Sequence, residues 1–203
     1  MKRNGFSRFE GALLAGLAAA ILVSSVGTRL QAGLAEKVLR LHVIANSDSA
    51  GDQALKLAVR DSVLARVEAL TRDADSAEKA RRAVEAGMSD IRRAAEETVA
   101  AAGRDDTINL TLGESYFPTK QYGDFALPAG RYDALRVVIG AGEGKNWWCV
   151  LFPPFCTAAV FADTAAAAGL GEEEIRFLTA DGGYELRFRL AEWVSLLRER
   201  LGI

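Results

Sequence analysis

Two cysteines and a single histidine are the residues of this chain that could supply a nucleophile and its base. Cys149 and Cys156 flank a pair of prolines at 153–154, and a turn there could bring the two sulfurs together in a disulfide. So short a loop would contribute about 2 kcal/mol, and two buried free thiols are the alternative. A cysteine nucleophile would need His42 as its base, but a histidine inside the apolar stretch LRLHVIA is ordinarily a hydrogen-bonded, partly buried side chain.

Carboxylates offer a second kind of chemistry. A hydrolase acting on cell wall or on peptide bonds would need two of them facing each other across a cleft. Four lie within the stretch 113–156, namely Glu114, Asp124, Asp133 and Glu143. This is an ordinary density of acidic residues, so the pattern alone does not indicate catalysis.

Other site chemistries find little support. Two cysteines and one histidine are too few for a closed structural zinc site, and nothing indicates a cofactor. The segment 140–145, GAGEGK, lacks the spacing and the hydroxyl of a phosphate-binding loop, so we predict a flexible turn. A net charge of -2 without a large basic cluster argues against nucleic acid as a partner.

The stretch 113–156 differs in composition from the rest of the chain. It holds both cysteines, all four prolines, two of the three tryptophans and three of the four tyrosines. Proline and glycine order the backbone, and aromatic rings supply contact area at low entropic cost, so we predict an ordered contact surface. Trp147 and Trp148 would alternate across a strand, one ring inward and one outward. The alternative is that these residues pack loops over the core.

The elements that must position this surface follow from periodicity and capping. Alternating or continuous apolar residues predict strands at 37–45, 107–112, 132–139 and 147–152, with 132–139 central. Residues that recur at helical spacing predict helices after a cap at Ser49, at 77–102, at 157–168 and at 190–201. Alternation around Asp181-Gly182-Gly183 predicts a hairpin, 175–179 with 184–188. We therefore expect an α+β two-layer domain, with a mixed or antiparallel sheet packed by helices.

The N-terminal 27 residues have the character of a targeting segment. Basic residues precede an uncharged apolar run at 11–26, which suits a signal peptide or an N-terminal membrane anchor, with a weak cleavage site after Gly27. A buried core helix is the alternative. We predict a leader at 1–27 and a single exported domain at 28–203, which contacts the membrane only through the leader.

Two long phrases resemble one known family, stage II sporulation protein R of endospore-forming bacteria. They are RLHVIANSDSAGDQALKLAVRDSVL at 40–64 and GESYFPTKQYGDFALPAGRYDALRVVIGAGEGKNWWCVLFPPFC at 113–156. The segment 77–102 and the chain after Cys156 match only in general character. The resemblance implies intercompartmental signalling in sporulation. Members are secreted from the forespore into the intermembrane space, where they activate a membrane-embedded aspartic protease that carries out pro-sigma-E processing.

The resemblance therefore implies a protease activator and no enzyme, either free or tethered to the forespore membrane. The alternative is a hydrolase of the same space that uses Cys149 or the carboxylates of 113–156; a merely structural protein fits the resemblance less well. The family does not indicate the contact residues, so their choice is our own inference. An aromatic face with nearby cations would bind the extracytoplasmic part of the protease. It would comprise Tyr116, Phe117, Tyr122, Tyr132, Trp147 and Trp148, with Lys120, Arg136 and Lys145 setting the register.

Overall fold

The computed structural model describes residues 31–123, 125–154, 165–166 and 169–179, together with Gly11, Leu14 and Gly16. The leader at 1–27 therefore lies outside the described residues except for those three positions. The helix expected at 190–201, most of the helix expected at 157–168, and the second arm of the hairpin expected at 184–188 also lie outside them. Within the described part, no helix has the length and hydropathy that a membrane span requires.

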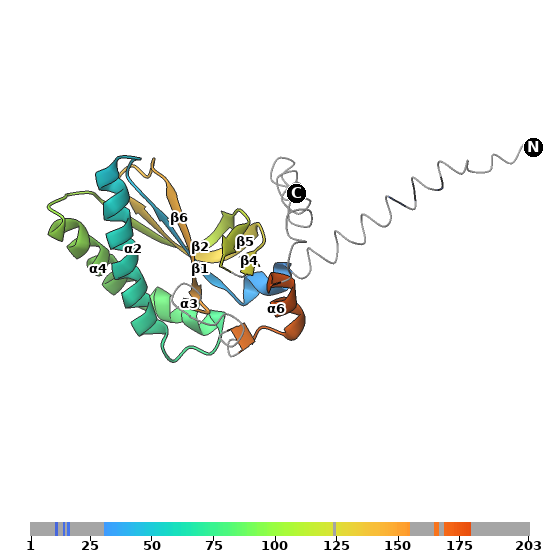
Figure 1. The fold of residues 1–203 in the computed structure, drawn as a ribbon. Helices are drawn as coiled ribbons and strands as arrows, with labels where there is room; N and C mark the ends of the chain where they lie inside the picture. The colour runs from blue at the N-terminus through green and yellow to red at the C-terminus, as the bar shows by residue number, and fades with distance from the viewer. Residues whose placement is uncertain are drawn as a thin grey trace, which may run out of the picture.

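A four-stranded mixed sheet forms the centre of the fold (Figure 1). Its order is β2 (Ile108–Phe117), β5 (Gly130–Ile139), β1 (Leu39–Ile44) and β6 (Asn146–Phe152). β5 runs parallel to β1 and antiparallel to β2, and β6 runs antiparallel to β1. β5 has a neighbour on each side, which confirms the central position predicted from its apolar residues on both faces.

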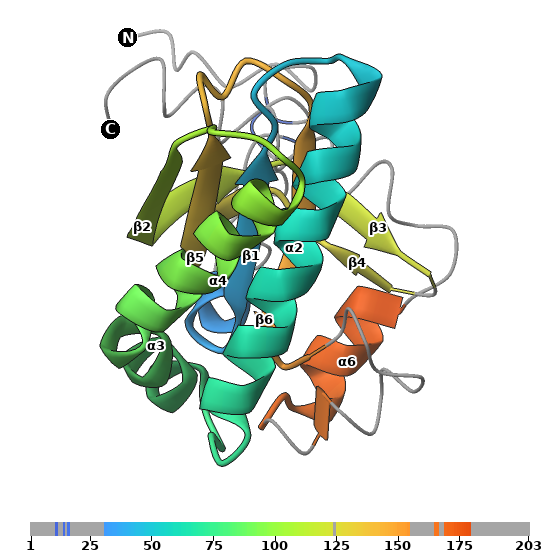
Figure 2. The ribbon, with the colours of Figure 1, turned by 90° about the vertical axis from the view of Figure 1, so that its left-hand side faces the viewer.

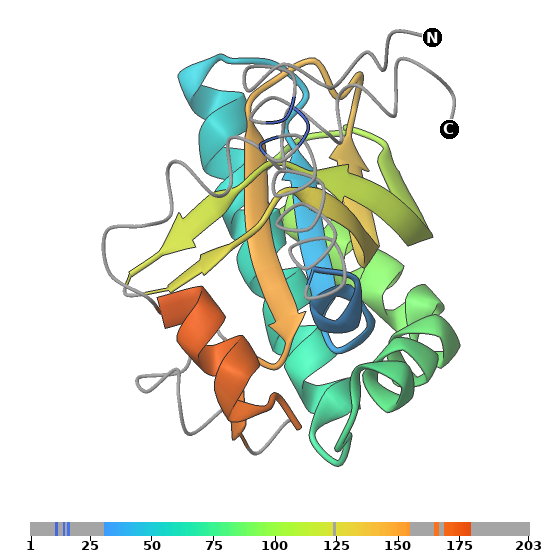
Figure 3. The same ribbon diagram turned by 90° about the vertical axis from the view of Figure 1, so that its right-hand side faces the viewer.

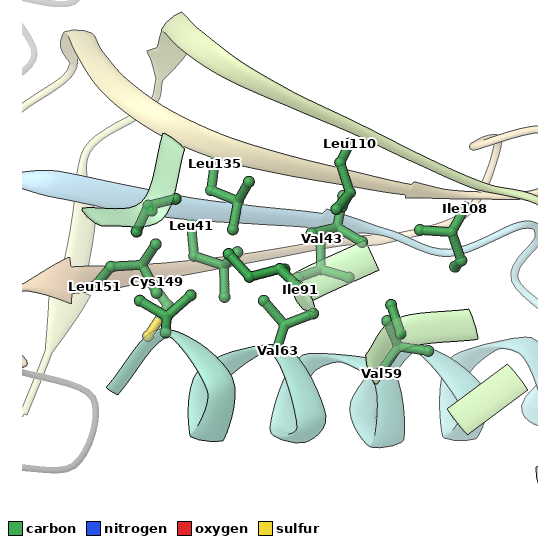
Figure 4. Packing of buried hydrophobic residues seen from close by; sticks show 14 of the residues in the cluster. Leu41, Val43, Val59, Val63, Ile91, Ile108, Leu110, Leu135, Cys149 and Leu151 are labelled. Carbon is green, nitrogen blue, oxygen red and sulfur yellow. The ribbon is translucent and has the colours of Figure 1, made fainter. Parts of the chain in front are cut away.

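Three helices cover one face of the sheet: α2 (Ala50–Thr71), α3 (Ala77–Ala86) and α4 (Met88–Ala101) (Figure 2). The Ser49 hydroxyl accepts a hydrogen bond from the Asp52 amide at 3.1 Å, so the predicted cap of α2 is confirmed. Alternate residues of the strands meet one stripe of each helix in the main core (Figure 4). Its members include Leu41, Val43, Leu135, Val137, Val59, Val63, Ile91, Cys149 and Leu151.

The other face carries a second, smaller core. The hairpin of β3 (Lys120–Tyr122) and β4 (Phe125–Leu127), the helical segment 31–36 and α6 (Glu172–Thr179) lie on this side (Figure 3). Its buried residues include Leu34, Val38, Phe117, Leu127, Tyr132, Val150 and Leu178. The α+β class and the helix-packed mixed sheet are thus confirmed, but the two-layer prediction did not include this second core.

The single helix predicted at 77–102 is two helices, broken at Gly87. Leu70 of α2 packs directly against this glycine, and a Cβ there would lie 2.4 Å from the Leu70 Cδ1. The chain turns at Gly87, with φ -93° and ψ 8°, so α4 follows a new direction. The break comes from packing between α2 and this segment. The apolar periodicity of 77–102 contains no information about that packing.

The first arm of the predicted hairpin is wrong, because 172–179 form α6. Glu174 accepts a hydrogen bond from the Gly171 amide at 2.7 Å, and three glutamates in the first turn suit the positive end of the helix dipole. Ile175 and Leu178, three residues apart, both pack on the second core. This helical spacing prevails over the alternation of Ile175 with Thr179.

Candidate functional site

Arg40 is the centre of an aromatic cluster on the second face of the sheet. The side chain comes from β1, is fully buried, and lies against three rings that we call the Arg40 cage: Phe117, Tyr122 and Tyr132. The guanidinium carbon is 4.0 Å from the Phe117 ring centroid, 4.9 Å from that of Tyr132 and 5.8 Å from that of Tyr122. These distances are within the range of cation–π attraction.

The Arg40 guanidinium is only partly satisfied by hydrogen bonds. Nη2 donates to the Tyr122 hydroxyl at 2.5 Å, while Nε and Nη1 have no acceptor among the residues that the structure describes. No carboxylate pairs with Arg40 in the described ranges. Burial lowers the pKa of Arg40, because water is removed from the charged form. A buried cation with no anion beside it among the described residues is therefore the least ordinary feature of this face.

The segment 127–130 holds Tyr132 of the cage in place through hydrogen bonds. The Tyr132 hydroxyl donates to the Pro128 carbonyl at 2.7 Å, and the Ala129 amide donates to the Thr119 hydroxyl at 3.1 Å. A Cβ at Gly130 would lie 2.0 Å from Nε2 of Gln31, so a side chain at this position would have to displace that amide. The phrase LPAG is therefore a structural support of the cage.

His42 lies beside Arg40 on the same face and forms a stack with β6. Its ring is 3.7 Å from that of Trp148, with 19° between the planes, and Nε2 donates to Oδ1 of Asn146 at 2.8 Å. Burial lowers the pKa of His42, and the positive charges of Arg136 and Arg40 act in the same direction. The expected buried, hydrogen-bonded histidine is confirmed.

The nine predicted contact residues do not form one face. Phe117 and Tyr132 are 0% and 1% exposed, so in this arrangement they support the surface from beneath and cannot touch a partner. Trp147 is 37% exposed and packs under Arg60 of α2, on the side opposite Trp148. Strand alternation likewise places Tyr116 opposite Phe117. The others are half-buried or exposed, namely Lys120, Tyr122, Arg136, Lys145 and Trp148.

The predicted turn at 140–145 is confirmed, and it is docked on the loop after β1. The Ala141 amide donates to Oδ1 of Asn46 at 2.8 Å, and the Lys145 amide donates to Oδ1 of Asp48 at 2.7 Å. Gly144 donates to the Ala45 carbonyl at 2.9 Å, and a Cβ there would lie 2.3 Å from the Ser47 carbonyl oxygen. These glycines allow close approach of two loops.

A buried carboxylate, Asp52, lies next to this loop in the first turn of α2. It accepts from the Ser47 hydroxyl at 2.5 Å, from Arg104 at 2.7 Å and from Asn46 at 3.1 Å. The Ser47 bond and the Arg104 charge lower the Asp52 pKa to about 2. The phrase NSDS therefore joins the start of α2 to its neighbouring loops, and these contacts give its polar residues a structural role.

The nucleophile hypothesis is wrong. Cys149 is disulfide-bonded and its side chain belongs to the helix-side core, whereas the His42 ring lies on the other face of the sheet. The two residues therefore cannot form a dyad. Cys156 lies outside the described residues, so its pairing with Cys149 stays a prediction.

Two of the four candidate carboxylates are neighbours. Glu114 and Asp133 face each other on β2 and β5, both on the exposed surface. Glu114 forms an ion pair with Arg131 at 3.1 Å, and Asp133 forms one with Arg81 at 3.4 Å. Both are surface ion pairs, which ordinarily contribute little to stability. Glu143 is exposed in the docked turn, and Asp124 lies outside the described residues. Within the described part of the chain, no cluster of residues could hold a metal ion.

Sequence reasoning missed Arg40. The signal was available, because an arginine in the otherwise apolar LRLHVI must either pair or be shielded. Its partners are distant in sequence: the sheet register places Phe117 and Tyr132, and the separate hairpin of β3 and β4 places Tyr122.

Most of this architecture lies in a segment that resembles known proteins. No solved structure matches the chain. The chain is similar to the stage II sporulation protein R of Bacillus subtilis (strain 168), with 35% identity over 182 residues, which cover 79% of this chain and 81% of the relative. Residues 35–162 match the family described as Stage II sporulation protein R. This chain therefore belongs to the stage II sporulation protein R family.

Proposed function

We propose that this chain is an exported signalling protein of sporulation, which activates a membrane-embedded aspartic protease and has no catalytic activity of its own. The activated protease would remove the pro-sequence of pro-sigma-E in the mother cell. The observation that carries the proposal is the family match at 35–162, which spans every strand from β1 to β6. The chain would act in the intermembrane space, reached through the leader at 1–27.

The uses of the reactive side chains support a binding role. Cys149 is in a disulfide, His42 is stacked on Trp148, and Asp52 joins two loops. Glu114 and Asp133 lie in exposed ion pairs. Each of these groups has a structural use that does not call for catalysis.

An activator must bind the active state of its target better than the resting state. If the active state is a protease dimer, a ligand that touches both subunits would favour it, and a difference of a few kcal/mol in binding would suffice. The second face suits this task. Trp148 is half-buried and packs against His42 and Phe117, so its ring loses little freedom on binding, and Tyr122 is half-buried on the same face. Lys120 and Arg136 would supply charge near them.

Co-expression in a host that does not sporulate tests the proposal. The full chain, the protease and pro-sigma-E are produced together, and cleavage of pro-sigma-E is measured. We expect cleavage only when all three are present, with loss on deletion of 1–27 and loss on substitution of the protease's own catalytic aspartate. Cleavage that persists without the protease would contradict the proposal.

A further inference from the structure

The inference concerns Arg40 and rests on the proposed function. The guanidinium is fully buried, and in the described part of the chain its only hydrogen-bond acceptor is a neutral phenol, which compensates the charge poorly. Hydrogen bonds from arginine to a carboxylate are roughly twice as strong as bonds to neutral acceptors. The resting protein thus holds a cation that an incoming anion would stabilise.

The unused donors have the arrangement that a carboxylate needs. A guanidinium binds a carboxylate bidentately through Nη1 with Nη2, or through Nε with Nη2. Within the described ranges, Nη1 and Nε have no acceptor, and Nη2 is bonded only to the Tyr122 hydroxyl. Each of the two bidentate pairs therefore combines one donor without an acceptor, Nη1 or Nε, with Nη2, which is bonded to Tyr122.

Tyr122 is the movable part of this arrangement. Phe117 and Tyr132 are buried in the second core, but Tyr122 is half-exposed and lies on a three-residue strand outside the main sheet. A two-stranded hairpin is marginal by itself, so displacement of this ring costs its stacking on Phe125, 5.3 Å away, and leaves the four-stranded sheet intact. Rotation of the Tyr122 ring would open the Arg40 cage from the second face.

We propose that Arg40 is a closed anion-binding site for a carboxylate side chain of the partner protease, and that this carboxylate displaces the Tyr122 hydroxyl when the complex forms. The binding energy then depends on a contact that exists only in the complex. Lys120 and Arg136, which we place near the same face, attract an acidic segment.

Three variants of the full chain test this assignment in the co-expression system, with co-purification of the full-length protease as the measure of binding. Arg40→Met removes the charge at similar volume, so we expect a thermal unfolding midpoint equal to or above that of the wild type. Binding to the protease should weaken by roughly 30-fold or more. Arg40→Lys keeps the charge without the bidentate fork and should weaken binding as well. Tyr122→Phe removes the competing hydroxyl, and binding should tighten several-fold.

Arg60→Met is the matched control, because Arg60 also stacks on a ring, that of Trp147 at 4.3 Å, but on the helix side of the sheet. Its binding should stay within about twofold of the wild type. Full binding by Arg40→Met, or no gain with Tyr122→Phe, would overturn the assignment. If the wild type itself neither binds the protease nor triggers cleavage, the proposed function fails instead.

Two further measurements identify the source of the anion. Acidic residues of the protease's extracytoplasmic part are changed singly to amides, and one such change should cause no further loss when combined with Arg40→Met. If every amide variant adds its full loss in that background, the assignment is wrong. Inorganic phosphate is then titrated into the free chain, and no saturable binding is expected. Saturable phosphate binding that Arg40→Met abolishes would indicate a small-anion site and overturn the assignment to the partner.

Discussion

His42 and Trp148 are register partners on β1 and β6, and their rings stack at 3.7 Å on the second face of the sheet. The stack joins β1 to the edge strand β6. It lies beside the Arg40 cage, because Phe117 of the cage contacts both rings edge-on. The stack therefore links Trp148, on the proposed contact surface, to a histidine whose protonation state changes with pH.

The first prediction concerns this protonation. Burial lowers the pKa of His42 below the ordinary 6.5, so between the two values the unfolded chain binds a proton that the folded chain does not. The contribution to stability is complete above about pH 6.5 and decreases as the pH falls below it. We expect the free energy of unfolding, measured with urea, to fall between about pH 7.5 and about pH 5.5. His42→Gln should flatten this part of the profile, and an unchanged slope in the variant would show that His42 is not the group responsible.

Asp52 should govern a separate acid range. Its pKa of about 2 lies below the ordinary 3.8, so its contribution is complete above about pH 4 and decreases as the pH falls toward 2. Asp52→Asn should be less stable than the wild type at neutral pH, because Arg104 and Ser47 lose a charged acceptor. It should also lose less stability between pH 4 and pH 2. Identical acid profiles for the two proteins would contradict this account.

Gly144 tests the docking of the two loops. A Cβ at this position would collide with the Ser47 backbone at 2.3 Å, which cannot rotate away, so Gly144→Ala should lower stability by about 2 kcal/mol or more. Gly113→Ala is the control, because a Cβ there meets no atom within 4 Å. Its stability should change by less than about 1 kcal/mol. Equal losses in the two variants would refute the packing argument.

The two tryptophans should differ in their roles. Trp148→Ala should cost about 2 kcal/mol, because a half-buried, stacked ring is lost, and should reduce cleavage of pro-sigma-E. Trp147→Ala should cost less stability than Trp148→Ala and leave cleavage intact, since Trp147 is 37% exposed and lies on the helix side. Trp148→Tyr retains a stacking ring and separates folding from contact. If secreted, folded variants at 148 still support normal cleavage of pro-sigma-E by the protease, the second face is not the contact surface.

The parts of the fold that local pattern determines were predictable. Apolar runs located β1, β5 and β6, alternation located the first half of β2, and the Ser49 cap located the start of α2. The break at Gly87 was not predictable in this way, because Leu70 causes it from another helix. The same holds for β3 and β4, whose three-residue strands are too short for a periodicity to emerge.

The candidate site was predicted in its residue types and not in its geometry. Tyr122 and Trp148 lie on the face that matters in this account, while Phe117 and Tyr132 proved to be its buried support. Sequence composition cannot separate a ring on the surface from one beneath it, because burial depends on which strand lies alongside. Arg40 is an instance of this, since its Tyr122 partner is 82 positions away.

The most direct test is a titration of the purified chain against membrane vesicles that contain the protease and pro-sigma-E, with cleavage as the readout. The account predicts that cleavage rises with the amount of chain and saturates near one chain per binding site on the protease. Vesicles without the protease should show no cleavage at any amount of chain. Complete activation by trace amounts of chain, or cleavage in vesicles that lack the protease, would show that the chain is itself a catalyst.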